Sequence, residues 1–363
     1  MRRLIVCCDG TWKAAESATL TNVTYTARAI APIASDGVPQ IVLHDPGVGT
    51  GNLMDRIGGG ALGRGLDENV KDCYRFLVYN YEPGDDVMVF GFSRGAYTAR
   101  STVGMIRKCG LLRKPNAGRL GDAYNLYRRR DDEVDGPEAT AFRTAYSWPR
   151  LEIAFLGVWD TVGSLGIPLA GLRWLTRRKY QFHDVRLSRI VKRACHAVAI
   201  DERRGAFAPT LWETQPDSTQ TVEQTWFVGV HSDVGGGYED RGLASITLQW
   251  MVKRAYDAGL EFNHQYLHDE LAIDLTKPAN TDAANVGATL HNSRTGLYLL
   301  TRTHIRPIGR DSSRREAVWH TAKNRADDAT LDYAPRNLVD YLASPRPVIS
   351  GPDGMPTGAQ VIR

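Results

Sequence analysis

Short apolar runs recur along the first 230 residues, and each ends abruptly in polar residues or glycine. Such runs are typical of strands that are buried on both faces of a parallel sheet. The predicted strands cover 4–8, 40–43, 87–92, 153–159, 197–200 and 226–230. Apolar positions at helical spacing predict helices over 66–81, 94–107 and 243–259. This alternation predicts an α/β fold with a mostly parallel central sheet, helices on both faces and a functional site at the carboxyl ends of the strands.

The pattern also predicts the domain organisation. Residues 1–260 form the expected catalytic core, and two charged or aromatic segments, about 111–150 and 163–190, are expected to be insertions at the strand carboxyl ends. Beyond 260 the alternation weakens, so 261–363 is expected to be an extension packed on the core. Within it, LYLLTRTHIRPI at 297–308 predicts one more strand, and the last 20 residues form a proline-rich tail.

Composition narrows the class of protein. The 363 residues are 42% hydrophobic with a net charge of +4, which fits a globular enzyme and argues against a nucleic-acid partner. The five cysteines are odd in number and lie mostly in apolar runs, which predicts buried, reduced thiols and folding in the cytoplasm. The pattern contains neither a signal peptide nor a membrane span. Action outside the cell would therefore require a dedicated secretion system.

A candidate nucleophile lies between a predicted strand and a predicted helix. Ser93 is the centre of Gly91-Phe92-Ser93-Arg94-Gly95, the G-x-S-x-G pattern of a nucleophile elbow. The glycines let the strand and helix approach closely, while the serine hydroxyl stays exposed on a strained turn. The backbone N–H of Arg94 then lies at a helix N-terminus, where an oxyanion would form.

The expected chain order of a catalytic triad in this architecture is serine, acid, histidine. His231 follows the last predicted strand of the core and precedes three consecutive glycines, which makes it the candidate base. Asp160 and Asp201 each end a predicted strand between Ser93 and His231, so position alone leaves both open as the acid. Asp160 is favoured because basic residues adjoin Asp201 and offer it ion pairs instead.

Six ordered blocks carry a resemblance to a known family. They are CCDGTW at 7–12, LHDPGVGTG at 43–51, GFSRGAYTAR at 91–100, GVWDTVGSLG at 157–166, HAVAIDERR at 196–204 and WFVGVHSDVGGGY at 226–238. With them the chain resembles the α/β-hydrolase family that includes the phospholipase effectors of bacterial type VI secretion. The resemblance implies hydrolysis of carboxylic esters, in some members phospholipid acyl esters. It also implies roles as nucleophile, base and acid for Ser93, His231 and Asp160.

The same architecture draws a second oxyanion N–H from the loop after the first strand, which here points to Gly10 and Thr11. No cofactor or metal is expected, because a serine mechanism needs neither. The segment that includes Trp174, Leu175, Arg177 and Arg178 combines apolar and basic side chains, as a peripheral membrane contact would. The expected substrate is a lipid ester. A soluble esterase or thioesterase and a catalytically silent binding module are the alternatives, and no immunity or secretion partner is identified.

Overall fold

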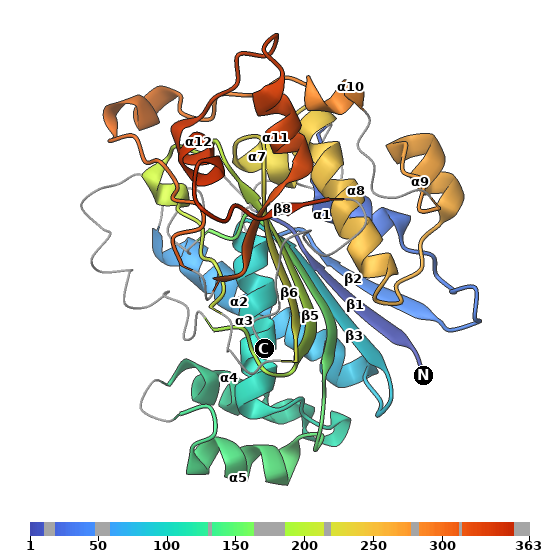
Figure 1. The fold of residues 1–363 in the computed structure, drawn as a ribbon. Helices are drawn as coiled ribbons and strands as arrows, with labels where there is room; N and C mark the ends of the chain where they lie inside the picture. Colours follow the sequence, from blue (N-terminus) through green and yellow to red (C-terminus); the bar gives the residue numbers. More distant parts are fainter. Residues whose placement is uncertain are drawn as a thin grey trace.

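The computed structural model describes residues 1–10, 19–47, 59–129, 133–162, 186–213, 219–276, 283–311 and 314–351. A single eight-stranded sheet crosses the molecule, with helices on both sides (Figure 1). Its strand order is β2-β1-β3-β4-β5-β6-β7-β8, and every neighbouring pair is parallel. All eight strands therefore end at the same edge, as the alternating sequence pattern predicted.

Each strand is short, and the chain visits the sheet in nearly sequential order. The strands are β1 (Arg3–Cys8), β2 (Gln40–Asp45), β3 (Asp86–Phe92), β4 (Ile153–Trp159), β5 (Val191–Ala199), β6 (Thr221–Phe227), β7 (Glu316–Trp319) and β8 (Ile349–Ser350). Register is continuous through the centre, where Cys8 pairs with Gly91 and Phe92 pairs with Trp159. The ends of β1, β3 and β4 consequently lie side by side.

Helices fill the connections between strands. The α-helices are α1 (Asn22–Ala29), α2 (Gly59–Asn80), α3 (Arg94–Cys109), α4 (Leu120–Arg128), α5 (Pro137–Tyr146), α7 (His231–Gly235), α8 (Gly242–Tyr256), α9 (His264–Leu271), α10 (Ala283–Val286), α11 (His320–Asp327) and α12 (Arg336–Leu342). The described residues also form the 3₁₀ turns η2 (Lys114–Arg119), η3 (Gly205–Phe207) and η4 (Gly296–Leu300). No helix in the described part of the chain is both long and apolar enough to cross a bilayer.

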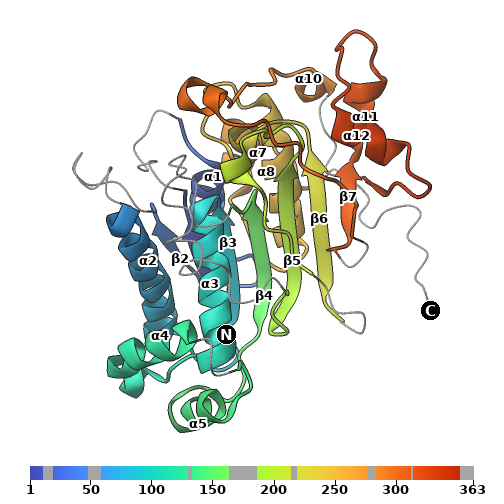
Figure 2. The same ribbon diagram turned by 90° about the vertical axis from the view of Figure 1, so that its left-hand side faces the viewer.

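Two separate hydrophobic cores explain why the strands are apolar throughout. Along β1, Leu4 and Val6 pack against α2 and α3, whereas Ile5 and Cys7 face the core shared with α1 and α8. Alternate side chains of a strand point to opposite faces, so a sheet covered on both sides needs apolar residues at every position. In Figure 2 the strands from β3 to β7 are spread side by side from left to right, with α2 and α3 over one end of the sheet.

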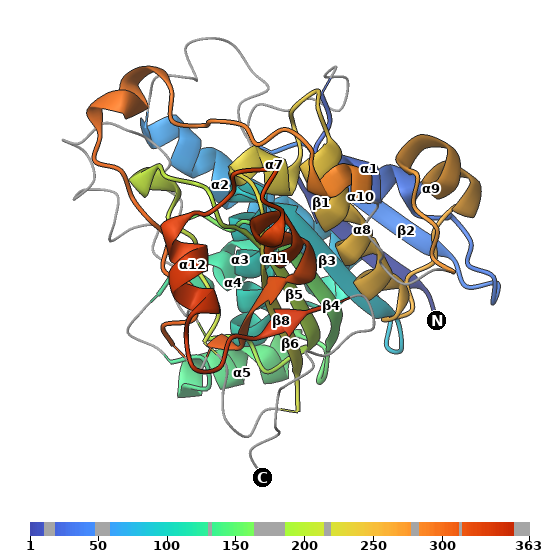
Figure 3. The same ribbon diagram turned by 45° about the horizontal axis from the view of Figure 1, so that its top comes forward.

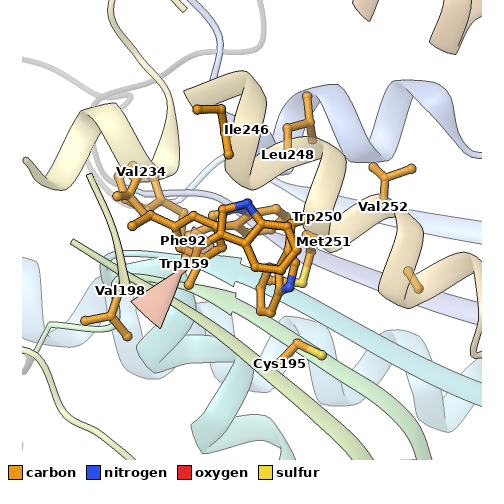
Figure 4. Packing of buried hydrophobic residues seen from close by; sticks show 14 of the residues in the cluster. Phe92, Trp159, Cys195, Val198, Val234, Ile246, Leu248, Trp250, Met251 and Val252 are labelled. Carbon is orange, nitrogen blue, oxygen red and sulfur yellow. The ribbon is translucent and has the colours of Figure 1, made fainter. Parts of the chain in front are cut away.

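The second core supports the site described below. Trp250 and Met251 of α8 pack over the sheet, close to Phe92 and Trp159 at the ends of β3 and β4 (Figure 4). Trp159 and Trp250 are fully buried. Buried aromatic side chains contribute large apolar area and fix their neighbours by close packing. The strand ends that carry the candidate residues are therefore held in place by the tightly packed core.

Three predictions about organisation need correction. Segment 111–150 connects the end of α3 to the start of β4, so α4 and α5 lie at the amino ends of the strands, opposite α7 (Figures 1 and 2). The predicted strand at 297–308 is wrong: this stretch contains the 3₁₀ turn η4. The sheet also continues past residue 260, because β7 and β8 extend it beyond β6.

Local hydrogen bonds explain why residues 297–308 do not form the predicted strand. The Arg294 guanidinium donates a hydrogen bond to the Leu299 carbonyl at 3.0 Å, and the Thr301 hydroxyl donates one to the Tyr298 carbonyl at 2.7 Å. These local bonds satisfy carbonyl groups that a strand would offer to a neighbour, and they close the chain into a turn. Apolar content without a sheet partner is therefore not enough to make a strand.

Candidate active site

Ser93 occupies a strained turn between β3 and α3. Its φ and ψ are 58° and −118°, in the region that side-chain-bearing residues rarely adopt. A Cβ on Gly91 would lie 2.5 Å from the Gly95 carbonyl oxygen, and one on Gly95 would lie 2.1 Å from the Cys8 carbonyl oxygen. Both glycines are thus required by close backbone contact. The turn has the geometry that the G-x-S-x-G pattern predicted.

Asp160 and His231 are in direct contact at the same edge of the sheet. Asp160 directly follows β4 and His231 begins α7, which lies over the carboxyl ends of the strands (Figure 3). The Nδ1 atom of His231 lies 2.6 Å from Asp160 Oδ2. Since a carboxylate only accepts, Nδ1 carries the proton and Nε2 is left as the basic nitrogen. His231 is thus held at the start of a helix.

A buried arginine, which the sequence did not predict, completes the Asp160 environment. Arg306 donates to Asp160 Oδ1 through Nη1 at 2.6 Å and to Oδ2 through Nη2 at 3.0 Å, and both side chains are fully buried. The backbone N–H of Ala199 adds a third donor at 3.0 Å. Burial alone would raise the pKa of Asp160, but the Arg306 guanidinium and the His231 bond outweigh it and hold the pKa well below its usual range.

Aromatic rings hold the imidazole of His231 from two sides. The Phe92 ring lies at 4.6 Å and the Phe207 ring lies edge-on at 4.9 Å, both between ring centroids. Phe92 directly precedes Ser93, so the residue before the candidate nucleophile packs against the candidate base. The His231 backbone N–H donates to buried Glu202 at 3.3 Å, and Glu202 also accepts two bonds from the Arg204 guanidinium. Packing and hydrogen bonds therefore fix the position of the histidine.

Asp201, the alternative acid, belongs to a different network. Its Oδ2 accepts from the Tyr333 hydroxyl and from the Gly229 N–H, both at 2.8 Å. Burial raises its pKa to about 6, although these two bonds partly oppose the shift. The structure thus brings Asp160, not Asp201, to the imidazole of His231.

The expected oxyanion donors differ in their surroundings. The Arg94 N–H lies in the first turn of α3, where backbone N–H groups lack intrahelical acceptors. Gly10 lies next to Ser93, because a Cβ built on it would be 3.5 Å from Ser93 Cβ. Its N–H, however, donates to Asp9 Oδ1 at 2.6 Å. Thr11 lies outside the described residues, so the Gly10–Thr11 role stays a prediction.

Arg94, the residue that follows the candidate nucleophile, has a positively charged side chain. It is half-buried near Tyr298, and burial lowers its pKa to about 10, so it is still a cation at neutral pH. Among the residues that the structure describes, no carboxylate forms an ion pair with it. A cation without an internal counter-ion can pair with an anionic group of a bound molecule.

The expected membrane contact at Trp174, Leu175, Arg177 and Arg178 falls outside the described residues, so it stays a prediction. Three residues of the site were missed by sequence reasoning: Glu202, Phe207 and Arg306. Arg306 could have been noticed, because a charge between Ile305 and the apolar pair Pro307-Ile308 suggests a buried ion pair. Nothing in the local sequence marks Phe207 as a neighbour of His231.

One group of side chains has the composition of a metal site. In the described part of the chain, ligand atoms of Cys8, Asp45 and Cys73 lie within 4.8 Å of one another, away from His231 and Asp160. Thiols bind metals as thiolates. A hydrogen bond with Cys73 and burial both raise the pKa of Cys8, and burial raises that of Asp45. These shifts favour the protonated, neutral forms of Cys8 and Asp45, which suit packing in the core better than metal binding.

Comparison with known proteins places this geometry in a family. A model for the type VI secretion system phospholipase effector Tle1-like catalytic domain matches residues 2–254. The chain belongs to this family. The matched part of this Tle1-like chain contains Ser93, Asp160 and His231, whereas Arg306 lies beyond it. The sequence-based assignment to the hydrolase family with type VI phospholipase effectors is confirmed, and so is the predicted fold class.

This chain matches only part of each individual relative. An uncharacterised protein of Saccharomyces cerevisiae is 29% identical over 241 residues, which is 59% of this chain and 33% of the yeast protein. A crystal structure of an uncharacterised Pseudomonas aeruginosa protein matches 72% of this Tle1-like chain and 46% of its own, at 21% identity and a TM-score of 0.42.

A Tle1 effector solved bound to the VgrG spike matches 66% of this chain and 51% of its own, at 18% identity and a TM-score of 0.39. The chain thus spans about a third to a half of these three relatives. Because a yeast protein also matches, the expectation that this chain is a bacterial secreted effector stays a prediction.

Proposed function

We propose that the chain is a serine hydrolase that cleaves acyl esters of phospholipids. Ser93 Oγ attacks the ester carbonyl carbon while its proton passes to His231 Nε2, and the N–H of Arg94 stabilises the oxyanion. Collapse of this intermediate breaks the ester C–O bond, and His231 returns the proton to the departing alcohol. Water then attacks the acyl-enzyme, again through His231, which releases the fatty acid and restores Ser93.

The observation that carries the proposal is the buried Asp160–His231 contact of 2.6 Å at the edge where Ser93 occupies its strained turn. The carboxylate fixes the tautomer with Nδ1 protonated and stabilises the imidazolium that forms during attack. Arg306 acts in this scheme as a positioning residue, because its two hydrogen bonds fix the orientation of the Asp160 carboxylate. Chain order, Ser93, Asp160, His231, agrees with that of α/β-hydrolases.

A phospholipid substrate is supported by two independent points. The family contains phospholipase effectors. The half-buried Arg94 guanidinium beside Ser93 also has no carboxylate partner among the described residues, which suits a phosphodiester near the scissile ester. A soluble ester without a phosphate would offer this cation no anionic group to pair with.

The experiment that tests the proposal compares wild type with Ser93→Ala on phospholipid vesicles and on a short-chain nitrophenyl ester. Turnover should fall about a thousandfold or more in Ser93→Ala on both substrates, with an unchanged melting temperature. Arg94→Met keeps the backbone N–H, so it should slow phospholipid hydrolysis and leave the neutral ester almost unaffected.

Retained activity in Ser93→Ala would exclude the serine mechanism. Activity on the short ester alone would identify a soluble esterase or thioesterase. A wild type inactive on both substrates would favour a scaffold that binds without catalysis.

A further inference from the structure

An exposed group of hydrophobic side chains lies on the segment that contacts Phe207, a neighbour of His231. Leu297, Leu299, Leu300 and Ile305, here named the apolar rim, are 72, 59, 86 and 51% exposed. Half of the large hydrophobic side chains exposed in the described part of the chain fall within these nine positions. Single exposed apolar residues are ordinary on a protein surface, but four large ones within nine positions indicate a place of contact.

Local bonds hold the apolar rim outward. The Arg294 and Thr301 side chains satisfy carbonyl groups within and beside η4, so the turn is closed by its own residues. Tyr298 points inward, and its ring lies 6.1 Å from the Phe207 ring and 5.2 Å from the Arg204 guanidinium. In Figure 1 the turn is the dark orange helical piece that projects at the upper left. The rim is thus presented by an anchored turn.

The apolar rim is connected directly to the candidate base. Phe207 contacts Tyr298 on one side and His231 on the other, at 6.1 and 4.9 Å between ring centroids. One aromatic side chain therefore separates the turn that carries the rim from the imidazole. A molecule that binds the rim would lie close to the aromatic contacts that connect Tyr298 to His231.

Charge around the apolar rim favours one kind of surface. Residues 283–310 contain four arginines and no aspartate or glutamate. Arg306 is buried and paired with Asp160, so it adds no charge to this surface. Arg302 and Arg310 are exposed, and exposed Arg203 is adjacent because its carbonyl accepts the His304 N–H at 2.9 Å. Leucine side chains flanked by arginines suit the boundary between acyl chains and anionic headgroups. A protein partner with an apolar groove would not need this excess of positive charge.

We propose that the apolar rim and its flanking arginines form the docking surface for an anionic phospholipid bilayer. The leucines insert among the headgroups, the arginines pair with lipid phosphates, and an ester of the same bilayer reaches Ser93 past Tyr298 and Phe207. This inference rests on the proposed function, since it names the surface from which the substrate comes. It differs from the sequence-based expectation, which assigned membrane contact to residues 174–178.

The test uses the full chain with Ser93→Ala, so that the vesicles are not consumed. Sedimentation with vesicles of phosphatidylcholine alone, or mixed with phosphatidylglycerol, should show tighter binding to the mixed vesicles. Leu297→Ser with Leu300→Ser should weaken that binding about tenfold or more. Ile33→Ser with Val339→Ser is the matched control, because both residues are exposed elsewhere at 63 and 46%, and it should bind as the parent does.

Each outcome bears on the inference. Equal vesicle binding by the rim variant and the parent would overturn it, as would equal binding to both lipid compositions. A parent dimer that becomes monomeric in the rim variant, with no vesicle binding by either, would assign the rim to self-association instead. The wild type is assayed in parallel for hydrolysis of the soluble ester and of the vesicles. Inactivity on both would overturn the proposed function, whereas a failure confined to vesicle binding would overturn the docking surface alone.

Discussion

Asp160 is the residue on which the candidate site depends most. It is fully buried, has a positive φ of 36°, and accepts hydrogen bonds from His231, Arg306 and the Ala199 backbone. An isolated buried carboxylate would be strongly destabilising, so the positive partner is required for Asp160 to stay ionised. Arg306 therefore stabilises the folded chain and also orients the candidate acid.

Arg306→Met should lower the free energy of unfolding by about 3–5 kcal/mol, because it leaves the Asp160 charge buried with fewer partners. The pKa of Asp160 should rise, so the acid limb of the kcat/KM profile should move to higher pH. The control is Arg254→Met, which breaks the partly buried Arg254–Glu223 pair. A smaller destabilisation without a shift of the acid limb is expected there. If the acid limb is also unshifted in Arg306→Met, Arg306 has only a structural role.

Asp201 should contribute a pH dependence of stability opposite to that of Asp160. Its pKa is raised from 3.8 to about 6 in the folded chain, so the folded state binds the proton more tightly than the unfolded state. Stability is then lost as pH rises between these values, by roughly 3 kcal/mol in all.

Asp201→Asn should remove this loss, so chemical denaturation should show a gain in stability over wild type at pH 8 and little difference at pH 4. Activity should be retained, since Asp201 contacts Tyr333 and not the His231 imidazole. A loss of activity comparable to that of Asp160→Asn would restore Asp201 as the candidate acid.

At the scale of elements, the turn between β3 and α3 was the best predicted part of the site. A strand, two glycines and a helix are all local signals, and the backbone contacts of Gly91 and Gly95 explain why the spacing is fixed. β7 and β8 were missed because they have four and two residues, too few for a periodic signal. Arg306 was missed as a partner because 146 residues separate it from Asp160.

Gly95→Ala should be among the most damaging substitutions in the chain. The added methyl group would lie 2.1 Å from the Cys8 carbonyl oxygen, so β1 and α3 would have to separate. We expect a loss of more than about 3 kcal/mol in the free energy of unfolding. Gly121→Ala in α4 is the matched control, because its methyl group would meet nothing within 4 Å. It should be neutral or stabilising by up to about 1 kcal/mol in urea denaturation.

At the scale of the whole molecule, the fold is larger than the region that the family model matches. The match ends at residue 254, but β7, β8 and Arg306 come from later in the chain. The sequence placed a core in 1–260 because regular alternation stops there. The structure instead shows that the later segment completes both the sheet and the Asp160 environment.

A chain that stops at residue 260 should therefore neither fold nor catalyse. It would expose β6 as an unpaired edge and remove fully buried Trp319 from the core. It would also leave Asp160 without Arg306. Circular dichroism melting should show no cooperative transition, in contrast to full-length Ser93→Ala. A soluble, cooperatively melting and active fragment would show that residues 261–363 are an independent addition.

The late position of Arg306 has a consequence for the order in which activity arises during synthesis. A nascent chain contains Ser93, Asp160 and His231 from residue 231 onward, 75 residues before Arg306 is added. At about 5–20 residues per second this interval lasts roughly 4 to 15 seconds. During that time Asp160 lacks its counter-ion and the sheet lacks two strands. Under the proposed function, the environment of the candidate acid is therefore complete only after residue 306 has been added to the chain.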